Sequence, residues 1–200
     1  MSIFTSSKVL GYENDPILGS VGSVAIPEFG TGFTRGMLQE TQPTKFDTLI
    51  RLSGFSHGTD VWLGNAKDLI LSGTASVNQA IGCRDDIMLY LIKCGLPEKR
   101  AFKFMESVRK GALHKGTAWP EGIVEEMREH QVPEWYIESC KKIKYLFPKA
   151  HAAAYVMMAF RIAWFKVHHP LAFYAAYFYR RSQKDGFDAV MMTHGIETVK

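Results

Sequence analysis

The stretch from Phe147 to Pro170, FPKAHAAAYVMMAFRIAWFKVHHP, constrains the fold most. Its residues are mostly apolar, and a proline stands close to each end, so the pattern predicts one long helix that begins after Pro148. Lys149 and His151 fall in its first turn, where free backbone N–H groups and the helix dipole attract anions and disfavour cations. Their position therefore predicts an anion supplied from outside the helix. The alternative is an ordinary core helix with a hydrogen-bonded histidine.

The rest of the chain also shows helical spacing of apolar residues, and no strand-like alternation of useful length. The predicted class is therefore all-α, an irregular multi-helix domain with a loop-rich N-terminal connector. Residues 1–32, rich in Gly, Ser and Pro, form the connector, residues 33–180 the helical domain, and residues 181–200 a C-terminal extension. Helices are predicted over residues 33–39, 43–54, 62–71, 85–93, 97–110, 123–130, 133–147 and 171–184.

Composition excludes several classes of protein. The chain has 200 residues, of which 46% are hydrophobic, which is enough for a packed core. No run of 18 apolar residues occurs, so a membrane span is not expected, and the N-terminus lacks the pattern of a secretion signal. The three cysteines lie far apart and show no metal-ligand spacing, which is typical of a reduced cytoplasmic protein.

The charges are unevenly distributed along the sequence. Residues 1–140 carry 14 Lys and Arg against 17 Asp and Glu, whereas residues 141–184 carry nine Lys and Arg and no acidic residue. A segment of one sign of charge is typical of proteins that face a polyanion such as nucleic acid or nucleotide phosphate. A solvated basic surface without function is the alternative.

The helix after Pro148 presents the strongest candidate site. His151 and Tyr155 are four residues apart and share one face. The small run Ala152–Ala154 lets a ligand approach closely. With Lys149, these side chains can bind a triphosphate and stack a base, an interaction of about 1–3 kcal/mol per base.

A second candidate lies in the turn formed by Ser56, His57, Gly58 and Thr59. Two short predicted helices flank this turn, an arrangement similar to a helix-hairpin-helix, whose turn amides hold a nucleic-acid phosphate. The alternative is a capped turn in which Ser56 or Thr59 begins the next helix. No serine-nucleophile context of the GxSxG kind is present.

Further cations stand at predicted helix ends. Arg84 precedes Asp85 and Asp86 at a helix start, which is a suitable phosphate site. Adjacent acids in a first turn are explained by the helix dipole, a gain of about 0.3–1 kcal/mol, and they splay too far apart for a two-metal site. Arg109 and Lys110 end a helix, where the dipole favours cations; DNA or nucleotide phosphate contact is the alternative.

Several long segments together resemble one known family. These are SGFSHGTDVWLGNAKDLI, IGCRDDIMLYLI, AFKFMESVRKG, VPEWYIESCKKIKYLFPKAHAAAYVMMAFRIAWFKVHHP and LAFYAAYF. They resemble the fingers region of the PolC-type DNA polymerase III alpha subunit, a C-family bacterial replicase of Gram-positive type. The similarity runs from about Ile26 to Tyr179, about three-quarters of the chain.

The resemblance implies a piece of a DNA-directed DNA polymerase that binds template–primer DNA and deoxynucleoside triphosphates in the cytoplasm. Two Mg²⁺ ions would be held by palm aspartates, and no motif for these is present here, so we expect no catalytic residue, no metal ligand and no activity in this chain alone. The connector would lead to the palm. The sliding clamp and other replisome subunits would bind elsewhere on the full-length protein.

The resemblance also implies roles for individual residues. Lys149, His151 and Tyr155 would face the nascent base pair and its triphosphate, with the turn Ser56–Thr59 near the nucleotide pocket. The remaining cations would contact phosphate or DNA: Arg84, Arg109, Lys110, Lys142 and Lys144. Two other hypotheses stay open, a non-catalytic helical nucleic-acid-binding module and a helical domain whose basic face binds an acidic protein.

Overall fold

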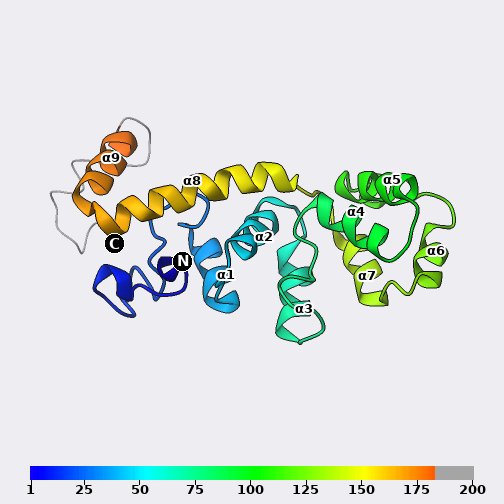
Figure 1. Ribbon diagram of the computed structural model, residues 1–200, viewed down its shortest axis with the longest axis horizontal. Helices are drawn as coiled ribbons and strands as arrows, with labels where there is room; N and C mark the ends of the chain where they lie inside the picture. Colours follow the sequence, from blue (N-terminus) through cyan, green and yellow to red (C-terminus); the bar gives the residue numbers. More distant parts are fainter. Residues whose placement is uncertain (183–200) are drawn as a thin grey trace. The chain divides into compact units, whose positions relative to one another are not determined.

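The computed structural model describes residues 1–182, which are helical with no strand among them, as the sequence predicts (Figure 1). The longer helices are α1 (Gly32–Thr41), α2 (Phe46–His57), α3 (Lys67–Leu71), α4 (Arg84–Lys93), α5 (Glu98–Arg109), α6 (Ile123–Glu129), α7 (Glu134–Lys142), α8 (Lys149–His168) and α9 (Pro170–Ser182). Short helical turns lie at η1 (Ser2–Phe4), η2 (Lys8–Leu10), η3 (Trp62–Ala66) and η4 (Leu113–Lys115).

The chain divides into two compact units. Within the described residues, one unit combines Met1–Thr44 with residues 157–182, and the other is the continuous segment Lys45–Val156. The boundary after Val156 falls inside α8. The boundaries predicted at residues 32 and 180 concern the parts of a polymerase and stay predictions. Most of the predicted C-terminal extension lies outside the described residues.

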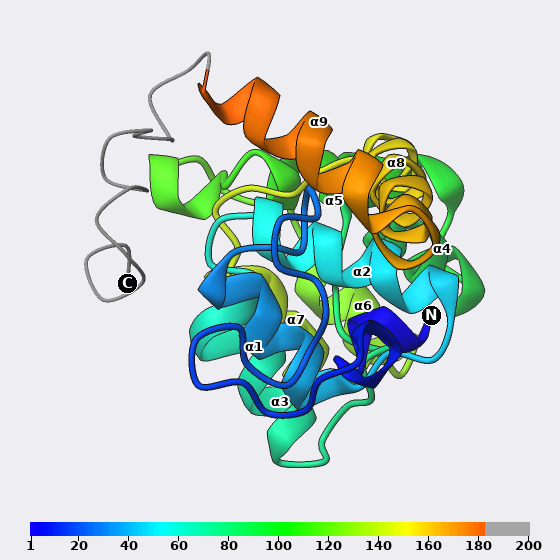
Figure 2. The same cartoon turned by 90° about the vertical axis from the view of Figure 1, so that its left-hand side faces the viewer.

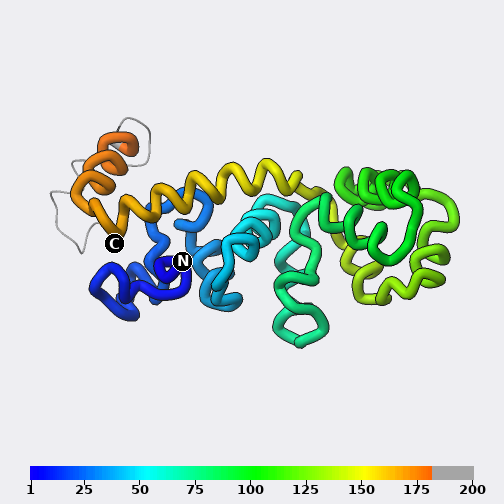
Figure 3. The backbone as a smooth tube through the Cα atoms, viewed as in Figure 1, coloured from blue at the N-terminus to red at the C-terminus, as the bar shows by residue number. Residues whose placement is uncertain are grey.

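The N-terminal connector is irregular but packed. Figure 3 shows its winding path before α1. Phe4 is fully buried, with its ring 5.3 Å from that of Phe29 and 6.2 Å from that of Phe160 in α8. A segment with only short helical turns therefore contributes apolar side chains to the core of its unit.

Lys166 joins the same connector to α8. Its side chain is buried, and its Nζ donates to the carbonyl oxygens of Gly22 at 2.7 Å and Val24 at 2.6 Å. The Nζ also lies 5.9 Å from the ring centroids of Phe173 and Tyr174 in α9. Burial lowers the pKa of Lys166 to about 8. This cation of the acid-free segment thus has a structural role.

The second unit is a helical core built from α2 to α7 and the first turns of α8. Leu49, Phe55, Ile87, Phe104 and Ile137 are buried at its centre. In Figure 1, α4, α5, α6 and α7 gather in one cluster. A buried polar pair links η3 to α7, because Ser139 Oγ donates to Asn65 Oδ1 at 2.7 Å.

Three predicted helices have different limits in the structure. α2 continues past Gly54 to His57. The helix predicted over residues 62–71 begins at Lys67, because Leu63 is extended and Gly64 has a φ of 69°. α7 ends at Lys142, and the five residues that follow are not helical.

α8 is a single continuous helix, as predicted, and Figure 2 shows it nearly along its axis. His169 and Pro170 then turn the chain into α9. Within the described part of the chain, none of the helices is long and apolar enough to cross a membrane.

Candidate functional site

The start of α8 is held by two carboxylates from distant parts of the sequence. Lys149 donates its backbone N–H to Asp85 Oδ2 at 2.7 Å, so a residue of α4 satisfies one of the free N–H groups of α8. The Lys149 Nζ lies 3.1 Å from Asp47 Oδ1 in the first turn of α2. The sequence predicts an anion from outside the helix, and this unit itself supplies two carboxylates at that position.

A row of neighbouring, mutually tilted rings lies at the start of α8. The ring centroid of His151 lies 4.7 Å from Phe147 and 4.5 Å from Tyr155. The row continues from Phe147 to His57, whose ring centroids are 5.3 Å apart. His151 is exposed and the Tyr155 side chain is 42% exposed, so both rings offer surface to a ligand. Through Phe147, the structure thus links His57 to His151 and Tyr155, and the contact of these residues with a nucleotide stays a prediction.

The segment Ile143–Pro148 holds this arrangement together through its backbone. Phe147 precedes a proline, which disfavours helical backbone and keeps the segment apart from α7 and α8. Thr59 donates its N–H to Tyr145 O at 3.0 Å, and Arg84 donates its N–H to Phe147 O at 3.0 Å. The end of α2 and the start of α4 are therefore attached beside the start of α8.

Some polar groups of the predicted turn Ser56–Thr59 already have hydrogen-bond partners within the chain. Ser56 Oγ donates to Ser53 O at 2.9 Å, and the Thr59 N–H is engaged by Tyr145. A Cβ at Gly58 would lie 2.3 Å from Val61 Cγ2 and 2.9 Å from Tyr145 O, so the backbone approach requires glycine. Neither Ser56 nor Thr59 caps the next helical segment, whose N-cap is Val61. A phosphate contact at this turn stays a prediction.

The predicted DNA-contacting cations are mostly engaged. Arg109 donates from Nη2 to Glu106 Oε2 at 2.8 Å, and Lys110 Nζ lies 3.0 Å from the same oxygen. Lys142 donates to Gly64 O at 2.7 Å, and Lys144 lies 2.8 Å from Asp60 Oδ2. Each of these side chains therefore already has a partner within the chain, and a contact with DNA stays a prediction.

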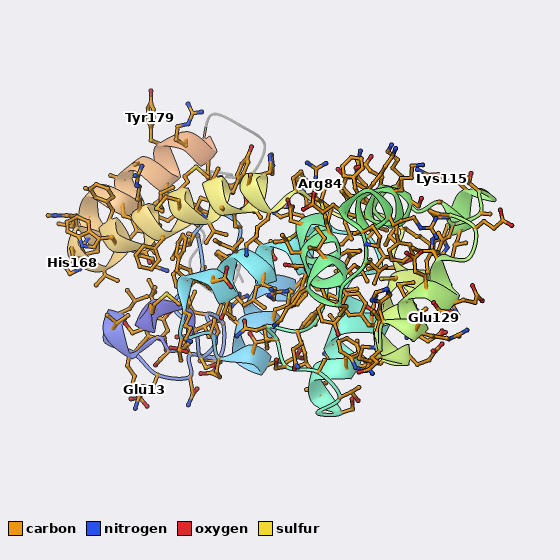
Figure 4. All side chains as sticks on the ribbon, turned by 45° about the vertical axis from the view of Figure 1, so that its right-hand side comes forward. Glu13, Arg84, Lys115, Glu129, His168 and Tyr179 are labelled. Atoms are coloured by element: carbon orange, nitrogen blue, oxygen red, sulfur yellow. The ribbon has the colours of Figure 1, made fainter. Side chains whose placement is uncertain are left out.

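Arg84 differs from the other predicted cations. Among residues 1–182 its guanidinium has no hydrogen-bond or ion-pair partner, and its side chain extends outward from the start of α4 (Figure 4). Its backbone N–H is bound to the segment that leads into α8. Arg84 is thus an available cation anchored close to Lys149 and His151.

The adjacent acids Asp85 and Asp86 do not form a metal site. Asp86 Oδ2 accepts from the backbone N–H groups of Gly82 and Cys83 at 2.9 and 3.0 Å, and it pairs with Arg51 Nη1 at 2.9 Å. Asp85 is directed to the start of α8. Within the described residues no three His, Cys, Asp or Glu side chains are placed to hold a metal ion.

A small pocket lies beside Lys149. The space in it that the centre of a water molecule can occupy is about 10 Å³, the lower limit for holding one water. A nucleotide does not fit inside such a pocket, so a ligand of α8 would lie on the exposed face of His151 and Tyr155. The pocket is lined by Asp47, Ile50, Arg51, Cys83, Asp86 and Lys149.

Sequence reasoning missed Asp47, Asp85, Arg51 and Phe147 as members of this site. The three charged residues are distant from Lys149 in sequence, and no local pattern shows that they approach it. For Phe147 a signal existed, because an aromatic residue directly before the proline of a functional helix is held in extended backbone beside the first turn.

The chain is similar to known bacterial proteins. A family model described as the bacterial DNA polymerase III alpha subunit finger domain matches residues 1–131. Proteins described as DNA polymerase III PolC-type are 56% identical over the whole chain in Streptococcus suis, Streptococcus thermophilus and Pediococcus pentosaceus. The chain spans only 13–14% of the length of these relatives.

Proposed function

The chain belongs to the family of finger domains of the bacterial DNA polymerase III alpha subunit, and from this membership we propose that it forms the fingers of a PolC-type replicative DNA polymerase. In this role the chain binds the incoming deoxynucleoside triphosphate and the template–primer DNA. Phosphodiester synthesis takes place in the full-length protein, in the cytoplasm, with the clamp and other replisome subunits bound elsewhere.

The arrangement at the start of α8 carries this proposal. A half-buried lysine stands in the first turn of a rigid helix, where an exposed histidine and tyrosine share one face, and the backbone of Arg84 is anchored nearby. Lys149 and Arg84 provide positive charge for a triphosphate, and the rings of His151 and Tyr155 provide a surface for a base. This combination fits a nucleotide better than it fits an acidic protein, which has no base to stack.

The chemistry of bond formation needs groups outside this chain. Bound Mg²⁺ would stabilise the charge on the transferring phosphate and lower the pKa of the attacking hydroxyl, and the palm aspartates that hold it are not among these residues. The contribution of the fingers is to bind and orient the nucleotide. Arg109, Lys110, Lys142, Lys144 and the turn Ser56–Thr59 are proposed as further DNA or nucleotide contacts.

The test is steady-state primer extension by the full-length polymerase carrying Lys149→Ala or His151→Ala. We expect the KM for each deoxynucleoside triphosphate to rise about tenfold, because stacking or a charge-assisted hydrogen bond contributes about 1–3 kcal/mol and 1.4 kcal/mol is a factor of ten. Lys99→Ala, which removes an exposed lysine from the first turn of α5, is the matched control and leaves KM unchanged. Unfolding of the variants with unchanged KM in the soluble fraction would contradict the proposal and favour a purely structural helix.

A further inference from the structure

Lys149 contacts two acidic residues in different ways. Asp85 accepts from its backbone N–H and so fixes the end of α8. Asp47 contacts only its side chain, at 3.1 Å between Nζ and Oδ1. A ligand can therefore replace Asp47 without disturbing the helix, whereas Asp85 has a structural task.

The contact between Asp47 and Lys149 is open to solvent. The Lys149 side chain is 38% exposed and that of Asp47 is 57% exposed. Ion pairs with this exposure are weak, because water screens them. The hydrogen bond from Lys149 to Asp47 nevertheless raises the pKa of the lysine, which stays charged at neutral pH. A charged lysine in a weak pair is ready to exchange its partner for a stronger anion.

The charged side chains that line the small pocket beside Lys149 balance one another. Four charged side chains line the small pocket, and they form two pairs, Lys149 with Asp47 and Arg51 with Asp86. The second pair is more buried, with side chains 12% and 14% exposed, and Asp86 also accepts two backbone N–H groups. Asp47 is thus the acid that can release its partner. When Asp47 is removed, the side chains that line the pocket carry one net positive charge.

Building on the proposed function, we propose that Asp47 is an internal competitor of the nucleotide triphosphate for Lys149. In the absence of nucleotide, the carboxylate of Asp47 holds and partly neutralises the lysine. A bound triphosphate takes over Lys149 and must overcome this contact first. Asp47 acts through Lys149, so it is a positioning residue that sets nucleotide affinity, and its effect is the same for all four bases.

The experiment measures KM and kcat for each of the four deoxynucleotides with full-length polymerase carrying Asp47→Asn, Lys149→Met or both changes. For Asp47→Asn we expect KM to fall about two- to fivefold, the range of an exposed ion pair, with kcat unchanged. In the Lys149→Met background, Asp47→Asn should have no further effect on KM.

Glu138→Gln is the matched control. It breaks an exposed pair with Lys141 at 2.6 Å, in which the lysine is 41% and the glutamate 51% exposed, and it should leave KM unchanged. An unchanged or higher KM for Asp47→Asn overturns the competition, as does an equal fall in the Lys149→Met background. If Lys149→Met itself leaves KM unchanged, the role of Lys149 in the proposed function fails as well, so the two failures are distinguishable.

Discussion

At the residue scale, Glu106 controls two of the predicted DNA contacts. Its carboxylate accepts from Arg109 and pairs with Lys110, and its side chain is 19% exposed. Hydrogen bonding from Arg109 is the main reason why the pKa of Glu106 is lowered from 4.5 to about 2. The glutamate therefore cancels one of the two positive charges at the end of α5.

This pairing predicts a stability effect in acid. Because the folded-state pKa lies below the unfolded one, the ionised Glu106 stabilises the fold above about pH 4.5, and this contribution is lost as the pH falls towards 2. The chain with Glu106→Gln lacks the contribution, so its free energy of unfolding should fall less between pH 5 and pH 2. Urea denaturation across this range measures the difference.

The control for this measurement is Glu13→Gln. It makes the same change of charge in a pair with Lys8 whose side chains are 69% and 59% exposed, where water screens the interaction. Parallel pH dependence of the wild type and Glu106→Gln would mean that Glu106 is not held by these cations in solution.

At the element scale, the packing of α2 depends on a glycine. A Cβ at Gly54 would lie 2.2 Å from Gly82 O, far closer than a normal contact. Alanine favours helix over glycine by about 1 kcal/mol, but here the clash outweighs that gain. We expect Gly54→Ala to lower the free energy of unfolding by about 1–3 kcal/mol, the usual effect of overpacking, in chemical denaturation of the 200-residue chain.

Gly36 in α1 provides the opposite case. It is also a helical glycine, but nothing lies within 4 Å of a Cβ built there. Gly36→Ala should therefore stabilise the chain by up to about 1 kcal/mol. If Gly54→Ala and Gly36→Ala change the free energy of unfolding in the same direction, the close packing of Gly54 against Gly82 does not determine how α2 responds to the substitution.

Gly54 also shows how far the sequence predicts the limits of helices. Apolar spacing of 3.6 residues located every long helix, because each helix buries one face. Gly54 was expected to end α2, yet it lies inside the helix, since it serves a contact with a distant backbone. Likewise α7 stops at Lys142 because the next residues bond to Thr59 and other remote groups.

The candidate site likewise contains contacts that the sequence predicts and contacts that it does not. His151 and Tyr155 are four residues apart and share a face of one helix, so spacing alone predicted that they lie together. Asp47 and Asp85 come from other helices, and only tertiary packing brings them to Lys149. Local periodicity contains no information on such contacts, and therefore the internal partners of Lys149 could not be predicted.

At the scale of the whole molecule, the acid-free segment 141–184 does not form a uniform basic surface in its described part. Lys144 and Lys149 pair with acids from earlier in the chain, and Lys166 is buried. Charge counted along a sequence differs from charge distributed over a fold, because helices bring remote acids to the segment. The available positive charge is concentrated on fewer residues, among them Arg84.

The chain covers about 14% of the length of its relatives, so its role must be tested in the full-length polymerase. Hydrogen exchange of the backbone, followed by mass spectrometry, tests the central claim directly. The polymerase is bound to a primer–template whose primer lacks a 3′ hydroxyl, with either the complementary or a non-complementary deoxynucleoside triphosphate. Residues 147–156 should exchange more slowly only with the complementary nucleotide, and α6 should not change. Unchanged exchange at residues 147–156, or equal protection by any nucleotide, would contradict the assignment of the start of α8 to the incoming nucleotide.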